Sequence, residues 1–130
     1  MKKNKFLKIL KILINFIIRR VGVVTFNNEV LILGDGHNPP LTVAGDKLNS
    51  YEICFEEGKN AALNMSQPII HSYDKILNNL NKLKENGQTA LGPAISSSLG
   101  LASQGLPGSC VVLCTDGMAN IGIGNIKLHK

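Results

Sequence analysis

The sequence predicts a single α/β domain with a mostly parallel sheet. Helical and strand-like patterns alternate along the 130 residues, as expected when helices cover a sheet. One apolar, β-branched run, Val111–Thr115, ends in Asp116-Gly117, which is typical of a buried parallel strand that carries a carboxylate at its carboxyl end. Hydrophobic residues make up 44% of the chain, which indicates a globular protein able to bury a core.

Residues 1–20 predict a basic amphipathic helix. They hold seven Lys and Arg and no acid, whereas the other 110 residues hold seven Lys and Arg against nine acids. This helix either packs on a sheet or lies in a membrane interface. Its apolar stretch is too often interrupted for a secretory signal or a membrane span. The interrupting residues form a polar stripe at spacings of four, three, four and four: Asn4, Lys8, Lys11, Asn15 and Arg19.

Strand patterns follow this helix directly. Val21–Asn27 and Glu29–Leu33 are rich in β-branched and apolar residues, and Asn27-Asn28 between them predicts a hairpin. Leu41–Gly45 fits either a short strand or an extended loop. Between these runs, Asp35 and His37 have the surroundings of turn residues rather than ligands.

Three helices and a last strand complete the predicted elements. Tyr51–Met65 predicts a helix that ends before Pro68. His71–Glu85 predicts a second one, with Ser72 as its N-cap and His71 as a solvated first-turn residue. Thr89 would cap a third helix over Ala90–Gln104, where Pro93 is tolerated in the first turn. The predicted strand is Ser109–Thr115.

Thr89 and Asp116 are the candidate metal ligands. Ligands of open α/β sheets bind outside the carboxyl ends of the strands, where both residues are expected. A hydroxyl and a carboxylate are oxygen donors suited to Mg²⁺.

These residues carry a family resemblance. Gln88-Thr89-Ala90 and Thr115-Asp116-Gly117 resemble the second and third segments of the metal-ion-dependent adhesion site of von Willebrand factor A (vWA) domains. The longer stretches Glu85–Ala94 and Cys114–Gly122 are similar to vWA-like domains found beside circularly permuted Ras-like GTPases. The first segment of the site, Asp-x-Ser-x-Ser, is absent from the chain. The resemblance therefore implies a degenerate site that binds Mg²⁺ weakly or not at all.

The resemblance also implies an incomplete fold. The vWA fold is Rossmann-like, with three layers and strand order 3-2-1-4-5-6. Residues 1–20 correspond to its first helix and residues 21–126 to part of its core, with strands 1, 5 and 6 missing. Residues 1–130 are thus expected to form a truncated domain that is marginally stable alone. Without strand 1, strands 2 and 4 would either close up and pair or keep unpaired edges.

No catalytic motif is found. Gly122-Ile-Gly124 lacks the third glycine of a dinucleotide fingerprint, Ser96-Ser97-Ser98 lies inside a predicted helix, and the histidines lack ligand spacing. Cys110 and Cys114 are too far apart on a strand to form a disulfide. Free thiols without an export signal favour a cytoplasmic location.

We therefore expect a non-enzymatic protein-interaction module. In intact relatives the metal accepts an acidic side chain of a protein partner, and the same class of partner is implied here. Nucleic acid is not expected, since the basic charge is confined to residues 1–20. The alternative is a peripheral membrane-surface protein anchored by residues 1–20.

Overall fold

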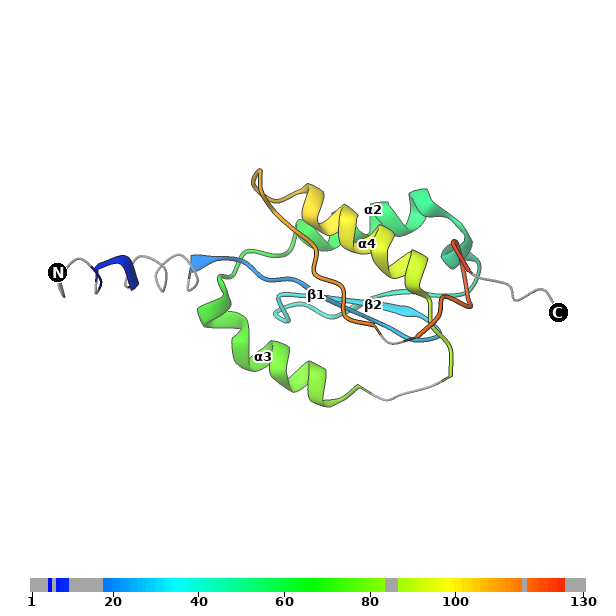
Figure 1. Cartoon of the computed structure of the whole chain (residues 1–130), viewed down its shortest axis with the longest axis horizontal. Helices are drawn as coiled ribbons and strands as arrows, with labels where there is room; N and C mark the ends of the chain where they lie inside the picture. Colours follow the sequence, from blue (N-terminus) through cyan, green and yellow to red (C-terminus); the bar gives the residue numbers. More distant parts are fainter. Residues whose placement is uncertain (1–4, 6, 10–17, 84–86, 116, 126–130) are drawn as a thin grey trace.

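The elements whose bounds the structure describes, three strands and three α-helices, form a mixed α/β unit. The structure is a computed structural model that describes residues 5, 7–9, 18–83, 87–115 and 117–125. Helices α2 (Tyr51–Ala62) and α4 (Leu91–Ser103) cover one face of the sheet, and α3 (Ile69–Asn81) lies on the opposite face (Figure 1). A 3₁₀ helix, η1 (Gly45–Asn49), leads into α2.

The sheet is antiparallel throughout its described part. Its strands are β1 (Val23–Phe26), β2 (Val30–Gly34) and β3 (Leu41–Val43), in the order β1-β2-β3. The predicted hairpin is confirmed, with Phe26 opposite Val30, and Leu41–Gly45 supplies β3. The prediction of a mostly parallel sheet is wrong for these strands. The short connections allow only antiparallel neighbours, because a parallel crossover needs a dozen or more residues.

The core lies between β2 and the α2–α4 pair. β2 is the most buried strand, since it has a neighbour on each side and helices over both faces. Val30 and Val43 are opposite one another in the sheet and are both fully buried. The core cluster consists of small and aliphatic side chains: Val30, Ile32, Val43, Leu48, Cys54, Ala61, Ala90 and Ala94.

Helices α2 and α4 cross at two glycines. A Cβ atom at Gly58 would collide with the carbonyl group of Ser97, and one at Gly100 would collide with the carbonyl group of Phe55. The two backbones therefore touch directly. This contact fixes α4, and with it the loop at its N-terminus that carries Thr89.

The predicted helices form, but two predicted caps are wrong. Ser50 caps α2, where its Oγ accepts a hydrogen bond from the N–H of Ile53 at 3.2 Å. In α3 the N-cap is Pro68, and Ser72 is instead a buried residue whose hydroxyl donates to the Pro68 carbonyl at 2.8 Å. In α4 the N-cap is Ala90, so the Thr89 hydroxyl does not cap that helix.

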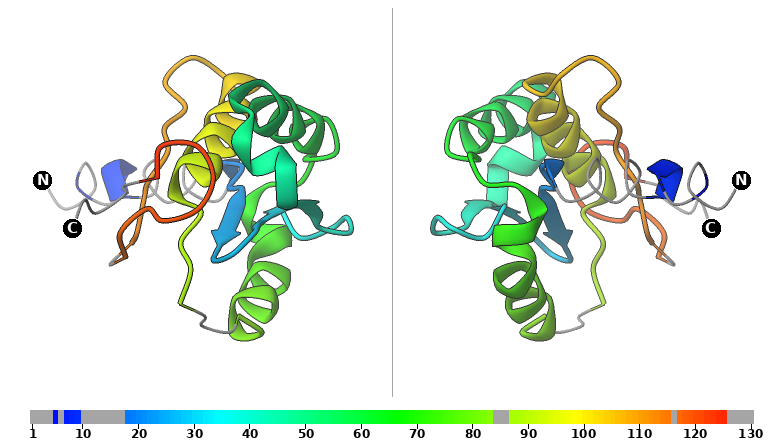
Figure 2. Two further views of the ribbon diagram at one scale, coloured as in Figure 1. Left: turned by 90° about the vertical axis from the view of Figure 1, so that its right-hand side faces the viewer. Right: turned by 90° about the vertical axis from the view of Figure 1, so that its left-hand side faces the viewer.

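The predicted strand Ser109–Thr115 is not formed. The segment is irregular and exposed, with 82% of Val112 accessible to solvent. It lies beyond β1, on the side of the sheet away from β3 (Figure 2, orange). A run of β-branched residues becomes a strand only where a neighbouring backbone supplies hydrogen bonds, and this segment has no such neighbour among the described residues.

Most of the predicted N-terminal helix lies outside the described residues. Lys5, the segment 7–9 and Ile18 are helical and exposed. Arg19 and Arg20 then lead into β1: the Arg19 carbonyl accepts a hydrogen bond from Ile69 at 2.8 Å, and Arg20 donates to the Met65 carbonyl at 2.9 Å. Within the described parts of the chain, no helix has the length and apolar character needed to cross a membrane.

Candidate functional site at the carboxyl end of β1

Three loops meet where β1 ends. Residues 27–29 follow β1, residues 87–90 precede α4, and residues 117–120 follow the exposed segment. The N–H of Ala90 donates to the Asn27 carbonyl at 2.7 Å, which ties the second loop to the first. Thr89 and Asn120 join the second loop to the third through one backbone hydrogen bond and one bond to the Asn120 side chain.

Asn120 forms a clamp on Thr89, with hydrogen bonds to both the N–H and the carbonyl group of that residue. Its Oδ1 accepts the Thr89 N–H at 2.8 Å, and its own N–H donates to the Thr89 carbonyl at 3.2 Å. Its Nδ2 also reaches the Gly87 carbonyl at 3.4 Å. Sequence reasoning missed this residue because nothing in its spacing distinguishes it from any other loop asparagine.

The Thr89 hydroxyl faces Gly117. A Cβ atom built on Gly117 would lie 2.7 Å from Thr89 Oγ1, so only a glycine fits there without displacing the hydroxyl. Gly117 directly follows Asp116 in the sequence. Asp116 itself lies outside the described residues, so its distance from Thr89 stays a prediction.

The described residues offer few metal donors. Nowhere among them does a group of three or more His, Cys, Asp or Glu side chains lie close enough to hold a metal ion. Asn120 Oδ1 is already bonded to Thr89. The Thr89 hydroxyl, which faces Gly117, is the described member of the predicted ligand pair, and Asp116 lies outside the described residues.

Asp35 has the structural role predicted for it. It is 1% exposed, and its two carboxylate oxygens accept the backbone N–H groups of His37 at 3.1 Å and Gln67 at 3.2 Å. The carboxylate thus holds both the turn after β2 and the connection between α2 and α3. Nearby, Nε2 of His37 lies 3.1 Å from the carbonyl oxygen of His71.

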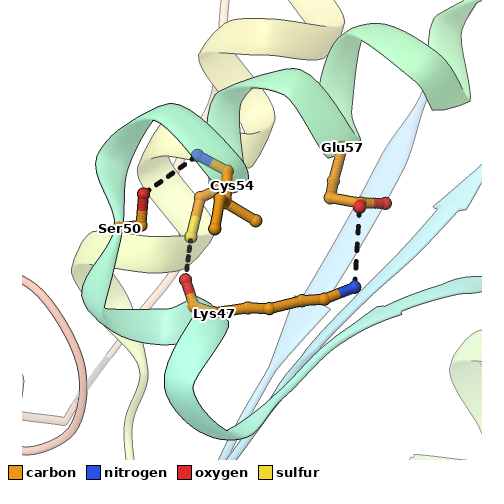
Figure 3. A network of polar contacts seen from close by, with 5 residues as sticks. Lys47, Ser50, Cys54 and Glu57 are labelled. Carbon is orange, nitrogen blue, oxygen red and sulfur yellow. Dashed lines mark hydrogen bonds and ion pairs between the residues drawn. The ribbon is translucent and has the colours of Figure 1, made fainter.

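The three cysteines are free, and they differ in exposure. Cys110 and Cys114 are exposed, whereas Cys54 is buried on α2. Its thiol donates to the Lys47 carbonyl at 3.4 Å, beside an ion pair between Lys47 and Glu57 at 3.7 Å (Figure 3). Burial raises the pKa of the Cys54 thiol, with the Glu57 carboxylate adding to the effect, while a backbone hydrogen bond acts in the opposite direction. The thiol is therefore kept protonated and unreactive.

The run Ser96-Ser97-Ser98 in α4 has no basic partner among the described residues. Ser96 donates to the Gly92 carbonyl at 3.0 Å, and the buried Ser97 hydroxyl has no hydrogen-bond partner among the described residues. Ser97 lies where α2 and α4 touch, so no substrate reaches it. A nucleophile needs an adjacent base to be activated, and these hydroxyls have none in the described part of the chain.

A comparison with known proteins finds one with a similar sequence. The chain is similar to a stretch of a Ras-related protein. Over 111 residues it is 36% identical to "Circularly permutated Ras protein 1" of Dictyostelium discoideum. The match covers 84% of this chain and 13% of the relative, so the chain corresponds to a small part of that protein. No protein-family model matches the chain, and no solved structure matches it.

Proposed function

We propose that this chain is a vWA-like protein-interaction module whose binding site is the three-loop cluster at the carboxyl end of β1. The observation that carries the proposal is the placement of the Thr89 hydroxyl against Gly117, next in sequence to Asp116. The similarity to a Ras-related protein supports the same reading, since the residue patterns resemble vWA-like domains found beside circularly permuted Ras-like GTPases.

The module acts by binding rather than by catalysis. A partner's acidic side chain would approach the Thr89 hydroxyl through a Mg²⁺ ion or a water molecule. A divalent cation of this kind takes about six oxygen ligands, and one hydroxyl with one carboxylate leaves most of them to water. The site is therefore a degenerate one, and its affinity for Mg²⁺ is low.

A magnesium titration followed by NMR tests the site. Amide shifts of residues 87–90 and 117–120 are expected to move at millimolar Mg²⁺, because weak hard-cation sites operate in that range. Thr89→Val removes the hydroxyl with little change of shape, and Asp116→Asn removes the charge; both should abolish the shifts. Thr42→Val on β3 is the matched control, since Thr42 is exposed and far from the loops in the sequence. Shifts that are equal in all four proteins would refute the site.

The alternative is a membrane-surface protein. The seven Lys and Arg without an acid in residues 1–20 favour it, because basic amphipathic helices bind anionic lipids. Sedimentation with vesicles of phosphatidylserine and phosphatidylcholine separates the two proposals. Binding that is lost in Lys8→Glu/Lys11→Glu but kept in Thr89→Val would favour the membrane.

A further inference from the structure

A cavity of about 260 Å³ lies where the turn after β2 meets the end of α2. Most of its wall is apolar, formed by Ile32, Leu33, Pro39, Leu41, Ala61 and Met65. Its volume is below the roughly 300–1,000 Å³ of sites for drug-sized ligands, so it suits a small molecule or a single side chain. The cavity is at the Gly34 end of the β1–β2 hairpin, whereas the three-loop cluster is at the opposite end, beyond Phe26 and Val30.

The polar part of the wall is negative in character. Among the described residues that line the cavity, the charged one is Asp35, which is 1% exposed. Asn38 and Asn64, both exposed at the rim, add amide groups, and Nδ2 of Asn38 donates to the Asn64 carbonyl at 2.9 Å. Helix α2 also ends here, and the carbonyl groups at a helix C-terminus carry partial negative charge.

The Asp35 carboxylate has no positively charged partner in the described part of the chain. Neither of the two ion pairs found there involves it. Arg20 reaches the same wall but donates to the Met65 carbonyl at 2.9 Å instead. Lys75 has its Cβ close to Gly36 on the same turn, yet it forms no ion pair with the carboxylate either. Buried charges are usually paired, because removing a charge from water is costly.

The carboxylate also has unused capacity for hydrogen bonds. Each of its oxygens accepts one backbone N–H, from His37 at 3.1 Å and from Gln67 at 3.2 Å. A carboxylate has about four lone-pair positions, so about two remain for further donors. A buried negative charge with free acceptor positions beside an apolar cavity is suited to a cationic donor on an alkyl chain.

We propose that this cavity binds a primary alkylammonium group, supplied by a lysine side chain or by a free alkylamine. The ammonium would donate to the Asp35 carboxylate, and the alkyl chain would lie along the apolar wall. A charge-assisted bond of this kind is stronger than one between neutral groups. The site does not involve Thr89 or Asp116, so it is independent of the loop site.

A divalent metal ion suits the cavity less well than an ammonium ion. Ca²⁺ and Mg²⁺ take about six or more oxygen ligands, usually with more than one negative charge among the protein and substrate groups. The described wall offers a single carboxylate, and no group of three or more metal-binding side chains occurs in the described chain. A metal ion would also make no use of the apolar wall.

Titrations followed by amide NMR shifts on the 130-residue chain test the proposal. The probes are Nα-acetyl-lysine methylamide for a lysine side chain and n-butylammonium for a free amine. Amide signals of residues 32–39 and 61–65 should shift, and those of 87–90 should not. Nα-acetyl-norleucine methylamide has the same four-carbon chain without the ammonium group, so it should bind about tenfold more weakly or not at all. The amine that binds more tightly identifies the source.

A pair of variants assigns the binding to the buried carboxylate. Asp35→Asn removes the charge and should weaken the binding of both amines about tenfold. Asp46→Asn, at an exposed aspartate of η1, is the matched control and should leave binding unchanged. If Asp35→Asn does not fold, the lysine and norleucine probes compared on the natural chain decide the question. Equal binding of these two probes, no shift with either amine, or unchanged binding in a folded Asp35→Asn would overturn the proposal.

Discussion

Asn120 holds the Thr89 loop with its side chain as well as its backbone. Asn120→Ala removes the bonds to Thr89 N–H and to the Gly87 carbonyl. We expect the free energy of unfolding to fall by about 1 kcal/mol, because both bonds are partly exposed to water. Urea denaturation measures the change. Asn49→Ala is the control, since Asn49 is exposed and makes no side-chain hydrogen bond among the described residues; equal losses in both variants would contradict the clamp.

The cysteines should separate into two reactive thiols and one inert thiol. Cys110 and Cys114 are exposed, while Cys54 is fully buried and its pKa is raised by burial. At pH 8 a disulfide reagent such as DTNB should react with two thiols at once and with the third only in denaturant. In Cys54→Ala, two thiols should still react at once with DTNB. Three fast thiols would show that α2 is not packed as described.

The raised pKa of Cys54 also fixes the sign of a pH effect. The unfolded thiol loses its proton near its ordinary pKa of 9.0, whereas the folded thiol keeps it to higher pH. The contribution to stability is therefore full below pH 9 and falls as the pH rises above that value. Cys54→Ala should lose less stability than the natural chain between pH 8 and pH 10 in urea denaturation. If the free energy of unfolding fell equally with pH in the two proteins, the raised pKa of Cys54 would be contradicted.

Helices α2 and α4 depend on a backbone contact that tolerates no side chain. Gly58→Ala places a methyl group against the Ser97 carbonyl, and the helices must move apart. We expect a loss of about 3 kcal/mol, at the upper end for overpacking, measured by thermal or urea unfolding. Gly87→Ala is the matched control, because a Cβ atom there meets nothing within 4 Å. A stable Gly58→Ala protein would show that the crossing is looser than described.

Elements whose partners are near in sequence could be predicted, and those that need a distant partner could not. The β1–β2 hairpin and the three helices follow from local patterns of residues. The strand at Ser109–Thr115 was predicted from the same kind of pattern and is absent, because a strand also needs a neighbouring edge. The predictions that Ser72 and Thr89 are N-caps were also wrong. The Ser72 hydroxyl donates to the Pro68 carbonyl, and the Thr89 hydroxyl faces Gly117, a residue distant in sequence, so neither is available as a cap.

The candidate site was predictable only in part. Thr89 was found because a threonine between Gln88 and Ala90 matches a known pattern, and the structure places its hydroxyl against Gly117. Asn120 was not found, since its role comes from a loop that folds back over 31 residues. Asp116 remains a sequence-based prediction.

As a whole, the molecule has a small core and a large exposed apolar surface. Val112→Lys should leave the free energy of unfolding within about 0.5 kcal/mol of the natural chain, because the side chain is 82% exposed. The same change should reduce self-association, so that analytical ultracentrifugation finds the chain monomeric up to a higher protein concentration. Ile32→Ala, at a core position 2% exposed, should cost about 3 kcal/mol. A large loss in Val112→Lys would mean that 109–115 is buried in solution.

The Asp35 carboxylate links two segments that are distant in sequence. It belongs to the turn after β2, yet one of the N–H groups it binds is that of Gln67, just ahead of α3. Strands that are adjacent in sequence form early, because closing a short loop costs little entropy. We therefore expect the β1–β2 hairpin to form before α3 docks, since the Gln67 N–H can reach its acceptor only after the turn that carries Asp35 is in place.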